Sequence, residues 1–291
     1  DSERRDFTIN AIYLDIEGNI YDPQAGTIDL KNNNVKFIGD PQKRIEEDYL
    51  RIIRFIRFKI MYDNKIEQTT NNAIKLNLHG IKKISKERIL VELYKILSFK
   101  NFMTLNDSKN LKEIFTYIFP EFENLRRLDR LKKICDHSQI SRNLLLACLL
   151  IDDKNSHEYF AHKYKISNNE RDKLNLFAKN VKFSLESKDF FNKDLEKNVY
   201  LYEKNHLIDL NILTFVINKK IKLKEFFLSL KKILSCKTHK FKIDGKYLIA
   251  NGMQQGASMG KVLKEVEEEW VKNNFKVSKN QIQRIIQFHS N

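Results

Sequence analysis

The sequence predicts an α+β chain that is predominantly α-helical, and three observations support this fold class. Short apolar segments separated by turn residues occur within residues 12–38, near the N-terminus. Apolar residues then recur at helical spacing along most of the chain. Between Gly80 and Gly245 there is no glycine, and Pro120 is the only proline. The 291-residue chain is therefore expected to place a small β-containing part before a long helical tract.

The N-terminal part is expected to contain a β-hairpin and one further strand. Residues 12–16 and 20–22 are rich in isoleucine and tyrosine and flank a polar turn at Gly18, which is the pattern of a hairpin. A turn of three asparagines then precedes residues 35–38, which we expect to form a short strand.

A helix is expected to begin at Asp40. An aspartate can cap a helix, and the following Pro41 suits the first helical turn. Apolar residues then recur every three or four positions as far as Ile60, so one helix is expected to pass through Glu47 and Asp48. Further helices with clear patterns are expected around residues 89–97, 144–151, 226–233 and 262–273.

The positive charge of the chain is unevenly distributed. The sequence has 53 Lys and Arg against 38 Asp and Glu, a net charge of +15, yet residues 1–61 carry 10 against 11. The remaining 230 residues therefore hold a net charge of +16. A lysine-rich surface suits nucleic acid, because each neutralised phosphate releases counterions. Charged helix faces that are merely solvated give the same excess, so charge alone leaves both explanations open.

Composition excludes several classes of protein. With 42% hydrophobic and 31% charged residues, the chain is neither disordered nor a membrane protein. Its longest apolar run, residues 144–151, is much shorter than the roughly 20 residues of a bilayer span. Three scattered cysteines without a CxxC motif indicate neither a disulfide framework nor a zinc site. We therefore expect a reducing, cytoplasmic location and no membrane contact. Because the sequence does not begin with Met and its motifs start at the first residues, we also expect that a preceding segment is missing.

Two adjacent arginines, Arg4 and Arg5, could bind a phosphate. Each guanidinium presents a planar fork of hydrogen-bond donors that matches phosphate oxygens. For these two residues alone, an exposed basic turn is the simpler explanation.

A second candidate site is a stripe formed by Asp48, Arg51, Arg54 and Arg57. Side chains three positions apart turn slowly around a helix, so these four are expected on one side of it. Surface salt bridges are the alternative explanation, and spacing alone does not decide between the two.

An aspartate and an arginine one helical turn apart have the chemistry to select a nucleobase. A carboxylate only accepts hydrogen bonds, whereas a guanidinium only donates them. Cytosine and adenine each present an exocyclic amine beside an acceptor ring nitrogen, while guanine and uracil present a carbonyl beside a ring N–H. Asp48 and Arg51 would therefore accept C and A, and would leave polar groups unpaired with G and U. Arg54 and Arg57 could then bind the triphosphate.

Four motifs follow one another in the first 58 residues: Arg4-Arg5-Asp6-Phe7-Thr8-Ile9-Asn10-Ala11, Asp22…Gly26…Asp29-Leu30, Ile38-Gly39-Asp40-Pro41 and Glu47-Asp48…Leu50-Arg51…Arg54…Arg57-Phe58. Their order and spacing resemble the class II tRNA nucleotidyltransferase and poly(A) polymerase family. The glycines between Gly245 and Gly260, with the Trp270 helix, resemble the C-terminal end of bacterial CCA-adding members. Two departures are Tyr49, where the family often has proline, and Ala25, which replaces the first glycine of a pair.

The resemblance implies a role for each matching residue. The residues implied to bind the incoming nucleotide are Arg5, Asp48, Arg51, Arg54 and Arg57, with Asp48 and Arg51 as the base-reading pair. The residues implied to support them are Arg4, Asp6, Asn10 and Glu47, the last by orienting the arginines.

The resemblance also implies a division into domains. Residues 1–40 would be the C-terminal remnant of a polymerase-β-like nucleotidyltransferase palm, which forms the head. An all-helical neck, body and tail would follow. Their expected ranges are residues 41–100 for the neck with its nucleotide-recognition helices, 101–238 for the body and 239–291 for a glycine-punctuated, tRNA-binding tail.

The metal-binding motifs of this family are not found in the sequence. In the family, a Gly-Ser motif and an Asp-x-Asp pair that holds two Mg²⁺ ions precede the double arginine. Two-metal phosphoryl transfer needs carboxylates that hold the ions about 4 Å apart. Asp15, Asp22 and Asp29 match no metal motif and are expected to be structural. We therefore predict no catalytic or metal-binding residue here, Mg²⁺ held by a segment upstream of residue 1, and a chain that is inactive alone.

The function implied by the resemblance is the addition of CCA to tRNA 3′ ends from CTP and ATP, without a nucleic-acid template. The expected partners are tRNA, nucleoside triphosphates and a separately encoded head segment. Two alternatives stay open: a poly(A) polymerase of the same family, against which the tail glycines argue, and a non-catalytic RNA-binding remnant. Whether C, A or both are added also stays open.

Overall fold

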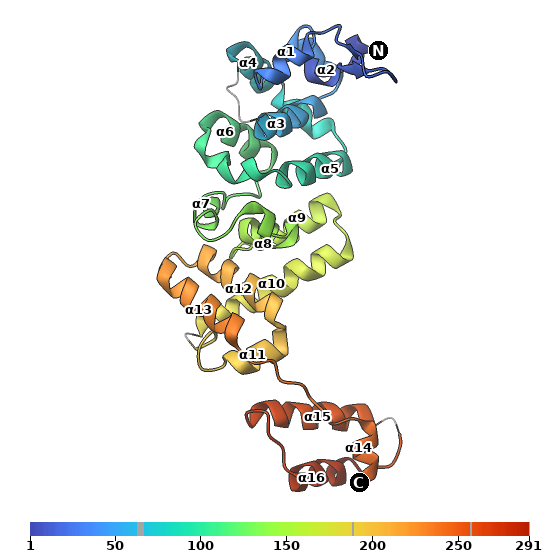
Figure 1. Cartoon of the computed structure of the whole chain (residues 1–291), viewed down its shortest axis with the longest axis vertical. Helices are drawn as coiled ribbons and strands as arrows, with labels where there is room; N and C mark the ends of the chain where they lie inside the picture. The colour runs from blue at the N-terminus through green and yellow to red at the C-terminus, as the bar shows by residue number, and fades with distance from the viewer. Residues whose placement is uncertain (63–66, 188, 257, 291) are drawn as a thin grey trace. The chain divides into compact units, whose positions relative to one another are not determined.

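The structure, a computed structural model, describes residues 1–62, 67–187, 189–256 and 258–290 (Figure 1). Helices make up most of it, and the small β part lies near the N-terminus, which confirms the predicted fold class. The chain divides into two compact units, residues 1–182 with 212–220 and residues 183–211 with 221–291. The four-part division implied by the resemblance stays a prediction. No helix in the described ranges is long and apolar enough to cross a membrane.

The first unit begins with the predicted hairpin in shortened form. Strands β1 (Tyr13–Leu14) and β2 (Ile20–Tyr21) pair antiparallel. The carboxylate of Asp15 stabilises the turn, because it accepts hydrogen bonds from the backbone N–H groups of Asn19 at 2.7 Å and Glu17 at 3.0 Å.

The prediction of a further strand over residues 35–38 is wrong. This segment makes one isolated antiparallel bridge, with Phe37 opposite Phe7. The chain on either side of Phe7 forms two short 3-10 helices, η1 (Ser2–Arg4) and η2 (Thr8–Asn10). Because the partner segment turns into a helix at once, the pairing cannot extend into a ladder.

A close backbone contact fixes the start of helix α1 (Gly26–Lys31). A Cβ on Gly26 would lie 2.1 Å from the carbonyl oxygen of Thr8, so this position requires glycine. The carboxylate of Asp22 accepts hydrogen bonds from the N–H groups of Gly26 at 2.7 Å and Thr27 at 2.9 Å. Ala25 precedes them with φ 54, in the left-handed region that glycine adopts without strain.

The single helix predicted from Asp40 to Ile60 is interrupted. Helix α2 (Pro41–Glu47) begins as predicted, with the Asp40 carboxylate accepting the N–H of Lys43 at 2.9 Å. At Asp48, however, the backbone is extended, and helix α3 (Leu50–Tyr62) starts two residues later. The Asp48 side chain accepts the N–H of Leu50 at 3.1 Å, a local hydrogen bond that competes with a continuous helix.

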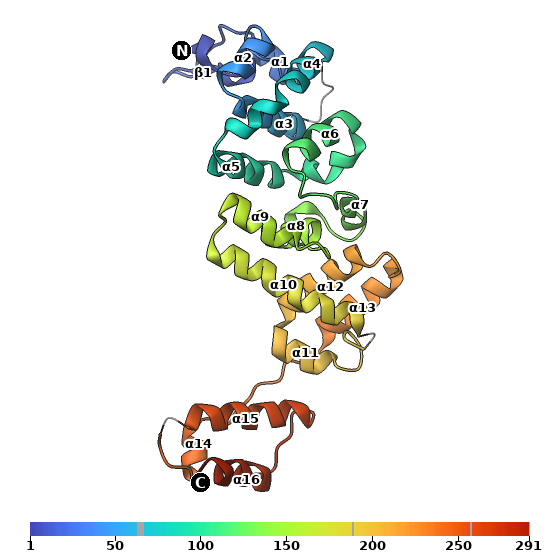
Figure 2. The same cartoon turned by 180° about the vertical axis from the view of Figure 1, so that it is seen from behind.

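The rest of the first unit is helical (Figure 2). Helix α3 packs against α5 (Lys86–Leu97), and α2 packs against α4 (Gln68–Asn77). The remaining elements are η3 (Leu78–Lys83), η4 (Lys100–Asp107), α6 (Lys109–Ile118), α7 (Arg127–Leu131), η5 (His137–Gln139), α8 (Arg142–Leu150) and α9 (Ser156–Tyr164). Helices α10 (Asn168–Glu186) and α12 (Lys204–Ile217) contribute to both units.

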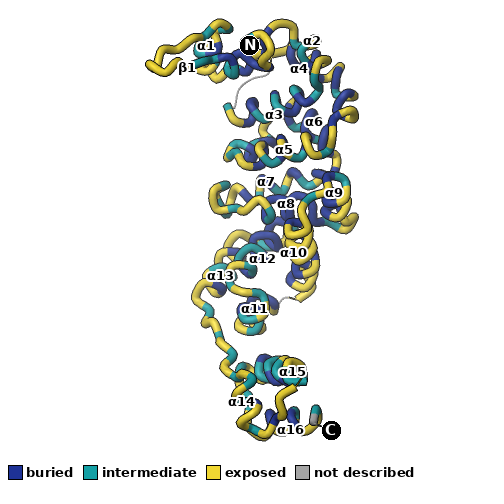
Figure 3. The backbone as a smooth tube through the Cα atoms, turned by 90° about the vertical axis from the view of Figure 1, so that its right-hand side faces the viewer, coloured by how far each residue is buried: buried dark blue, intermediate teal, exposed yellow. Residues whose placement is uncertain are grey.

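Buried aromatic and aliphatic residues form the core of the first unit. Figure 3 marks the buried positions in dark blue along the backbone. Helix α8 is buried from Leu144 to Leu150, as its unbroken apolar run predicts. Ring contacts link the aromatic residues Phe102, Phe115, Phe119, Phe122, Phe160 and Tyr164.

The second unit contains the C-terminal helices. Helices α11 (Leu195–Tyr202) and α13 (Leu223–Ser235) precede α14 (Gly245–Ala250), α15 (Met259–Lys272) and α16 (Lys279–Ser290). The last three enclose a core of Leu248, Met253, Val262, Val266, Ile282 and Ile286. Trp270 of α15 packs edge-on against Tyr200 of α11, with ring centroids 5.2 Å apart.

Candidate nucleotide-binding site

A polar pocket of about 420 Å³ lies between the N-terminal segment and the start of α3. The residues that line it are Arg4, Arg5, Asp6, Asn10, Asp48, Arg51 and Arg54. All seven are candidates from the sequence, so the structure brings together two motifs that are far apart in the chain. The other two candidates, Glu47 and Arg57, do not line the pocket.

Glu47 holds two arginines at the end of α2. Its Oε2 lies 2.7 Å from Nη1 of Arg44 and 2.5 Å from Nη1 of Arg51. The hydrogen bond from Arg51 is the main reason why the pKa of Glu47 lies below its ordinary value. Arg44 also donates to the backbone carbonyl of Arg5. Glu47 therefore fixes Arg51 at the wall of the pocket, and Arg44 ties this wall to the N-terminal segment.

Asp6 is a buried carboxylate that accepts two hydrogen bonds and forms one ion pair. Its Oδ1 accepts the side-chain amide of Asn10 at 2.7 Å and the N–H of Phe7 at 3.1 Å. Its Oδ2 lies 2.9 Å from Nε of Arg54. Asp6 and Asn10 thus hold Arg54 beside the pocket. The guanidinium of Arg5 pairs instead with Asp1, at 2.8 Å and in an exposed position.

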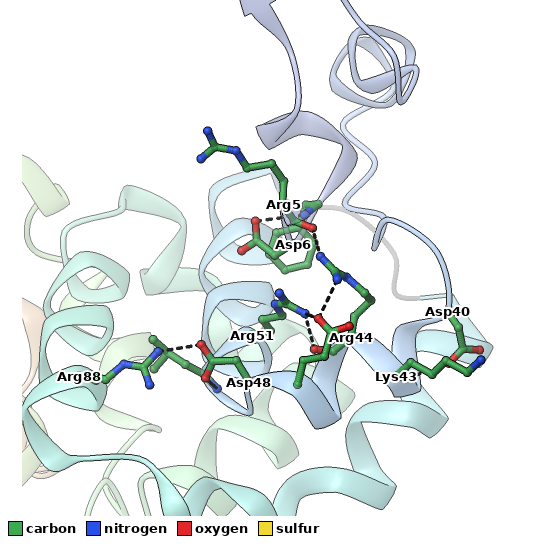
Figure 4. A network of polar contacts seen from close by, with 11 residues as sticks. Arg5, Asp6, Asp40, Lys43, Arg44, Asp48, Arg51 and Arg88 are labelled. Carbon is green, nitrogen blue, oxygen red and sulfur yellow. Dashed lines mark hydrogen bonds and ion pairs between the residues drawn. The ribbon is translucent and has the colours of Figure 1, made fainter. Parts of the chain in front are cut away.

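Asp48 lies in the break between α2 and α3, and not one turn before Arg51 on a common helix as predicted. Its Oδ1 accepts the N–H of Leu50, and its Oδ2 accepts a hydrogen bond from Nη2 of Arg88 at 2.7 Å. In the view of Figure 4, Asp48 lies between Arg88 and Arg51. Asp48 and Arg51 both line the pocket, so an acceptor and a donor border the same space.

Arg57 is engaged elsewhere. Its Nε lies 2.9 Å from Oε2 of Glu92 on α5, and its guanidinium stacks over the ring of Phe58 at 4.4 Å. Burial lowers the pKa of Arg57, and the nearby Glu92 opposes this effect. Two steps of three residues turn a side chain about 120° around a helix, so Arg57 faces α5 while Arg51 faces the pocket.

Sequence reasoning missed Arg88 and Glu92, the two residues of α5 that hold Asp48 and Arg57. They have opposite charges and are four positions apart, which places them on one face of a helix. Asp48 and Arg57 have no obvious partners nearby in the sequence. A pair of opposite charges four positions apart on a later helix is the signal that could have identified their partners.

Three acidic residues outside the pocket have structural roles. Asp15 stabilises the hairpin turn and Asp22 the start of α1, as described above, while Asp29 accepts the hydroxyl of Thr8 at 2.7 Å. Within the part of the chain that the structure describes, no group of three or more His, Cys, Asp or Glu side chains could hold a metal ion. The Mg²⁺ site that the resemblance implies upstream of residue 1 stays a prediction.

Two stretches of the sequence match known families. Residues 1–36 match the family described as the poly A polymerase head domain. Residues 64–125 match the family described as the probable RNA and SrmB-binding site of polymerase A.

Curated relatives match most of the chain. It is 36% identical over 218 residues to the CCA-adding enzyme of Staphylococcus haemolyticus, covering 72% of this chain and 50% of that protein. It is 32% identical over 290 residues to the CCA-adding enzyme of Lactococcus lactis, covering 95% and 67%. It is 30% identical over 289 residues to human CCA tRNA nucleotidyltransferase 1, mitochondrial, covering 97% and 65%. The chain thus spans from half to about two thirds of the length of these relatives.

Solved structures share the fold. The CCA-adding enzyme of Bacillus stearothermophilus in complex with CTP aligns with a TM-score of 0.68 at 21% identity, covering all of this chain and 74% of that one. The Thermotoga maritima CCA-adding enzyme complexed with tRNA aligns with a TM-score of 0.60 at 22% identity, covering 99% and 73%. At these identities, the likeness establishes a common fold.

Proposed function

The chain belongs to the family of CCA-adding enzymes and poly(A) polymerases, and we propose that it is the nucleotide-selecting and tRNA-binding part of a CCA-adding enzyme. Such an enzyme extends tRNA 3′ ends with C and A from CTP and ATP without a nucleic-acid template. The proposal draws support from relatives and solved structures named as CCA-adding enzymes, some in complex with CTP, ATP or tRNA.

The observation that carries the proposal is the composition of the polar pocket. Asp48 offers an acceptor and Arg51 a donor, the combination that complements the amine and ring nitrogen of cytosine or adenine. Three further guanidinium groups border the same space, and their charge suits a triphosphate. Those three residues are Arg4, Arg5 and Arg54. We assign base selection to Asp48 and Arg51, and phosphate binding to the other arginines.

The assignment of Arg57 changes with the geometry. Because its guanidinium pairs with Glu92 outside the pocket, we assign Arg57 a supporting role in holding α3 against α5, in place of direct nucleotide binding. Glu47 supports Arg51, and Asp6 with Asn10 supports Arg54, through the contacts described above.

We assign the Mg²⁺ chemistry to a segment other than the described residues, among which no group of three or more His, Cys, Asp or Glu side chains could hold a metal ion. We propose that a separately supplied head segment holds the metal ions on an Asp-x-Asp pair. The role left to this chain is to bind and orient the nucleotide and the tRNA end, so that the 3′-hydroxyl can attack the α-phosphorus and pyrophosphate can depart.

The lysine-rich remainder of the chain supports tRNA binding. Residues 62–291 hold a net charge of +16, and residues 64–125 match a family described as RNA-binding. Neutralising phosphates with such a surface releases counterions, so binding of tRNA should weaken steeply as salt increases. The cytoplasmic location stays a prediction, since one relative is mitochondrial by name.

A poly(A) polymerase is the second candidate, because both matching families are described by that activity. A non-catalytic RNA-binding remnant is the third. Products formed on tRNA and on generic RNA separate the first two, since only a CCA-adding enzyme stops after a defined tRNA 3′ end.

Binding of the four nucleoside triphosphates to the 291-residue chain tests the proposal. In equilibrium dialysis, CTP and ATP should bind at least about tenfold more tightly than UTP and GTP. Arg51→Gln should remove this preference. Arg126→Gln, which removes an exposed arginine outside the pocket, should retain it. Equal binding of all four nucleotides by the unaltered chain would contradict the proposed selection.

A further inference from the structure

We propose that Arg88 is a further specificity-determining residue, which positions Asp48 for base reading from outside the pocket. The inference rests on the proposed function, because it concerns how the base-reading pair is held. Arg88 does not line the pocket, and so it is a positioning residue that acts through Asp48.

Both oxygens of Asp48 have one fixed partner. Leu50 N–H donates to Oδ1 at 3.1 Å and Nη2 of Arg88 donates to Oδ2 at 2.7 Å. Each carboxylate oxygen can accept about two hydrogen bonds, so one acceptor position per oxygen stays available to a base. The two bonds together set the orientation of the carboxylate plane, because a single bond would leave it free to rotate.

The two reading side chains are each held by a partner of opposite charge. Arg88 holds Asp48 at 2.7 Å, and Glu47 holds Arg51 at 2.5 Å. Without these outer partners, the carboxylate and the guanidinium would attract and pair with each other. Such a pair would consume the acceptor and the donor that a base needs. The outer ions therefore keep Asp48 and Arg51 directed at the nucleotide.

Helix α5 is placed correctly for this role by a second ion pair. Glu92, one turn after Arg88, binds Arg57 at 2.9 Å and also Lys95 at 2.9 Å. Along α5 the positive Arg88 comes before the negative Glu92. Their partners follow in the opposite order of charge, with the negative Asp48 before the positive Arg57, so each residue of α5 meets an opposite charge. A shift of α5 by one turn would bring like charges together, so the two pairs fix its register against α3.

Because water reaches the Arg88–Asp48 pair, its effect on nucleotide selection can be measured apart from its effect on the stability of the fold. The side chains of Arg88 and Asp48 are 52% and 35% exposed. Ion pairs this accessible to water contribute little to the stability of the fold. Removing Arg88 should therefore change nucleotide selection while leaving the melting temperature close to that of the unaltered chain.

Nucleotide selection by Arg88 variants tests the inference. The readout is the ratio of the UTP and CTP dissociation constants, measured by equilibrium dialysis on the 291-residue chain. Arg88→Gln should lower this ratio about tenfold, the effect of losing a hydrogen bond to a charged group. Arg88→Lys keeps the charge without the planar fork and should give an intermediate ratio. Lys86→Gln removes a charge from the same turn of α5 and should leave the ratio unchanged.

A double-mutant cycle shows whether Arg88 acts through Asp48. In the Asp48→Asn background, Arg88→Gln should have no further effect on the ratio. If Arg88→Gln instead weakens CTP and UTP equally, or leaves the ratio at its original value, the inference is overturned while base selection stands. If the unaltered chain itself shows a ratio near one, the proposed base selection fails, and this inference fails with it.

Discussion

The carboxylate of Asp6, whose side chain is only 4% exposed, lies 2.9 Å from Nε of Arg54, a residue on a helix that begins more than forty positions later. This contact joins the N-terminal segment to α3 and forms one wall of the polar pocket. Because Asp6 is buried and its other oxygen is occupied by Phe7 and Asn10, its ion pair should contribute to both the fold and the site.

Asp6→Asn should destabilise the chain. The amide nitrogen of asparagine would face the N–H of Arg54, so two donors would meet in a buried position. We expect a loss of about 1–3 kcal/mol in the free energy of unfolding, measured by urea denaturation. Glu113→Gln, which breaks an exposed and longer pair with Lys75, should change it by less than about 0.5 kcal/mol. An equal, small effect of both variants would show that the Asp6–Arg54 pair is not structural.

Asp48→Ala should abolish discrimination between nucleobases. In a protein supplied with the metal-binding head segment, loss of the carboxylate removes the acceptor that distinguishes C and A from G and U. The measurement is the incorporation of each of the four nucleotides into tRNA that lacks its 3′ end. Asp107→Ala, which removes an exposed carboxylate outside the pocket, serves as the control. Unchanged nucleotide preference in Asp48→Ala would remove the base-reading assignment.

Gly80→Ala should destabilise the junction that carries Asp48. A Cβ on Gly80 would lie 2.0 Å from the ring of Tyr49, the residue that follows Asp48 in the break. Overpacking of this kind costs about 1–3 kcal/mol. The cost should shrink in a Tyr49→Ala background, because the clashing ring is then absent.

A matched glycine in α15 provides the control for Gly80→Ala. A Cβ on Gly260 meets no atom within 4 Å, so Gly260→Ala should leave the free energy of unfolding unchanged or raise it by up to about 1 kcal/mol. If the two alanine variants change the free energy of unfolding by the same amount in urea denaturation, then the close approach of Gly80 to Tyr49 does not destabilise the Gly80→Ala variant.

Asp209 should make stability depend on pH. Burial raises the pKa of this carboxyl group from 3.8 to about 6. Between these values the folded chain holds a proton that the unfolded chain has lost, so stability should fall as pH rises from about 4 to about 6. Asp209→Asn should therefore stabilise the chain at pH 7 by about 1–2 kcal/mol, with the gain disappearing near pH 4. A gain of the same size at both pH values would show that burial of the charge is not its cause.

Local signals in the sequence predicted the elements whose cause is local. The Asp40 cap and Pro41 start α2, the polar turn at Gly18 closes the hairpin, and the unbroken apolar run of α8 is buried. In each case, the residues that determine the structure are neighbours in the chain. The assembly of the pocket from two motifs that are far apart in the chain has no such local signal, and only the resemblance to a known family implied it.

The features that the sequence did not predict depend in large part on contacts between distant residues. The apolar period continues from Ile45 to Ile60, so nothing in it reveals that α2 ends at Glu47. The break is stabilised by the hydrogen bond from Leu50 and the ion pair with Arg88, and the latter residue lies on another helix. Similarly, Arg57 shares the spacing of the pocket arginines, yet Glu92 of α5 determines where its side chain lies.

The most direct test is the incorporation of labelled CTP and ATP, with Mg²⁺, into tRNA that lacks its 3′ end. Two samples are compared: this chain alone, and the chain supplied with a head segment that carries the Asp-x-Asp pair. We predict no incorporation by the folded chain alone, and addition of C and A once the segment is present. Efficient incorporation by the chain alone would show that metal-binding carboxylates lie within it, and failure of the complemented chain would contradict the proposed function.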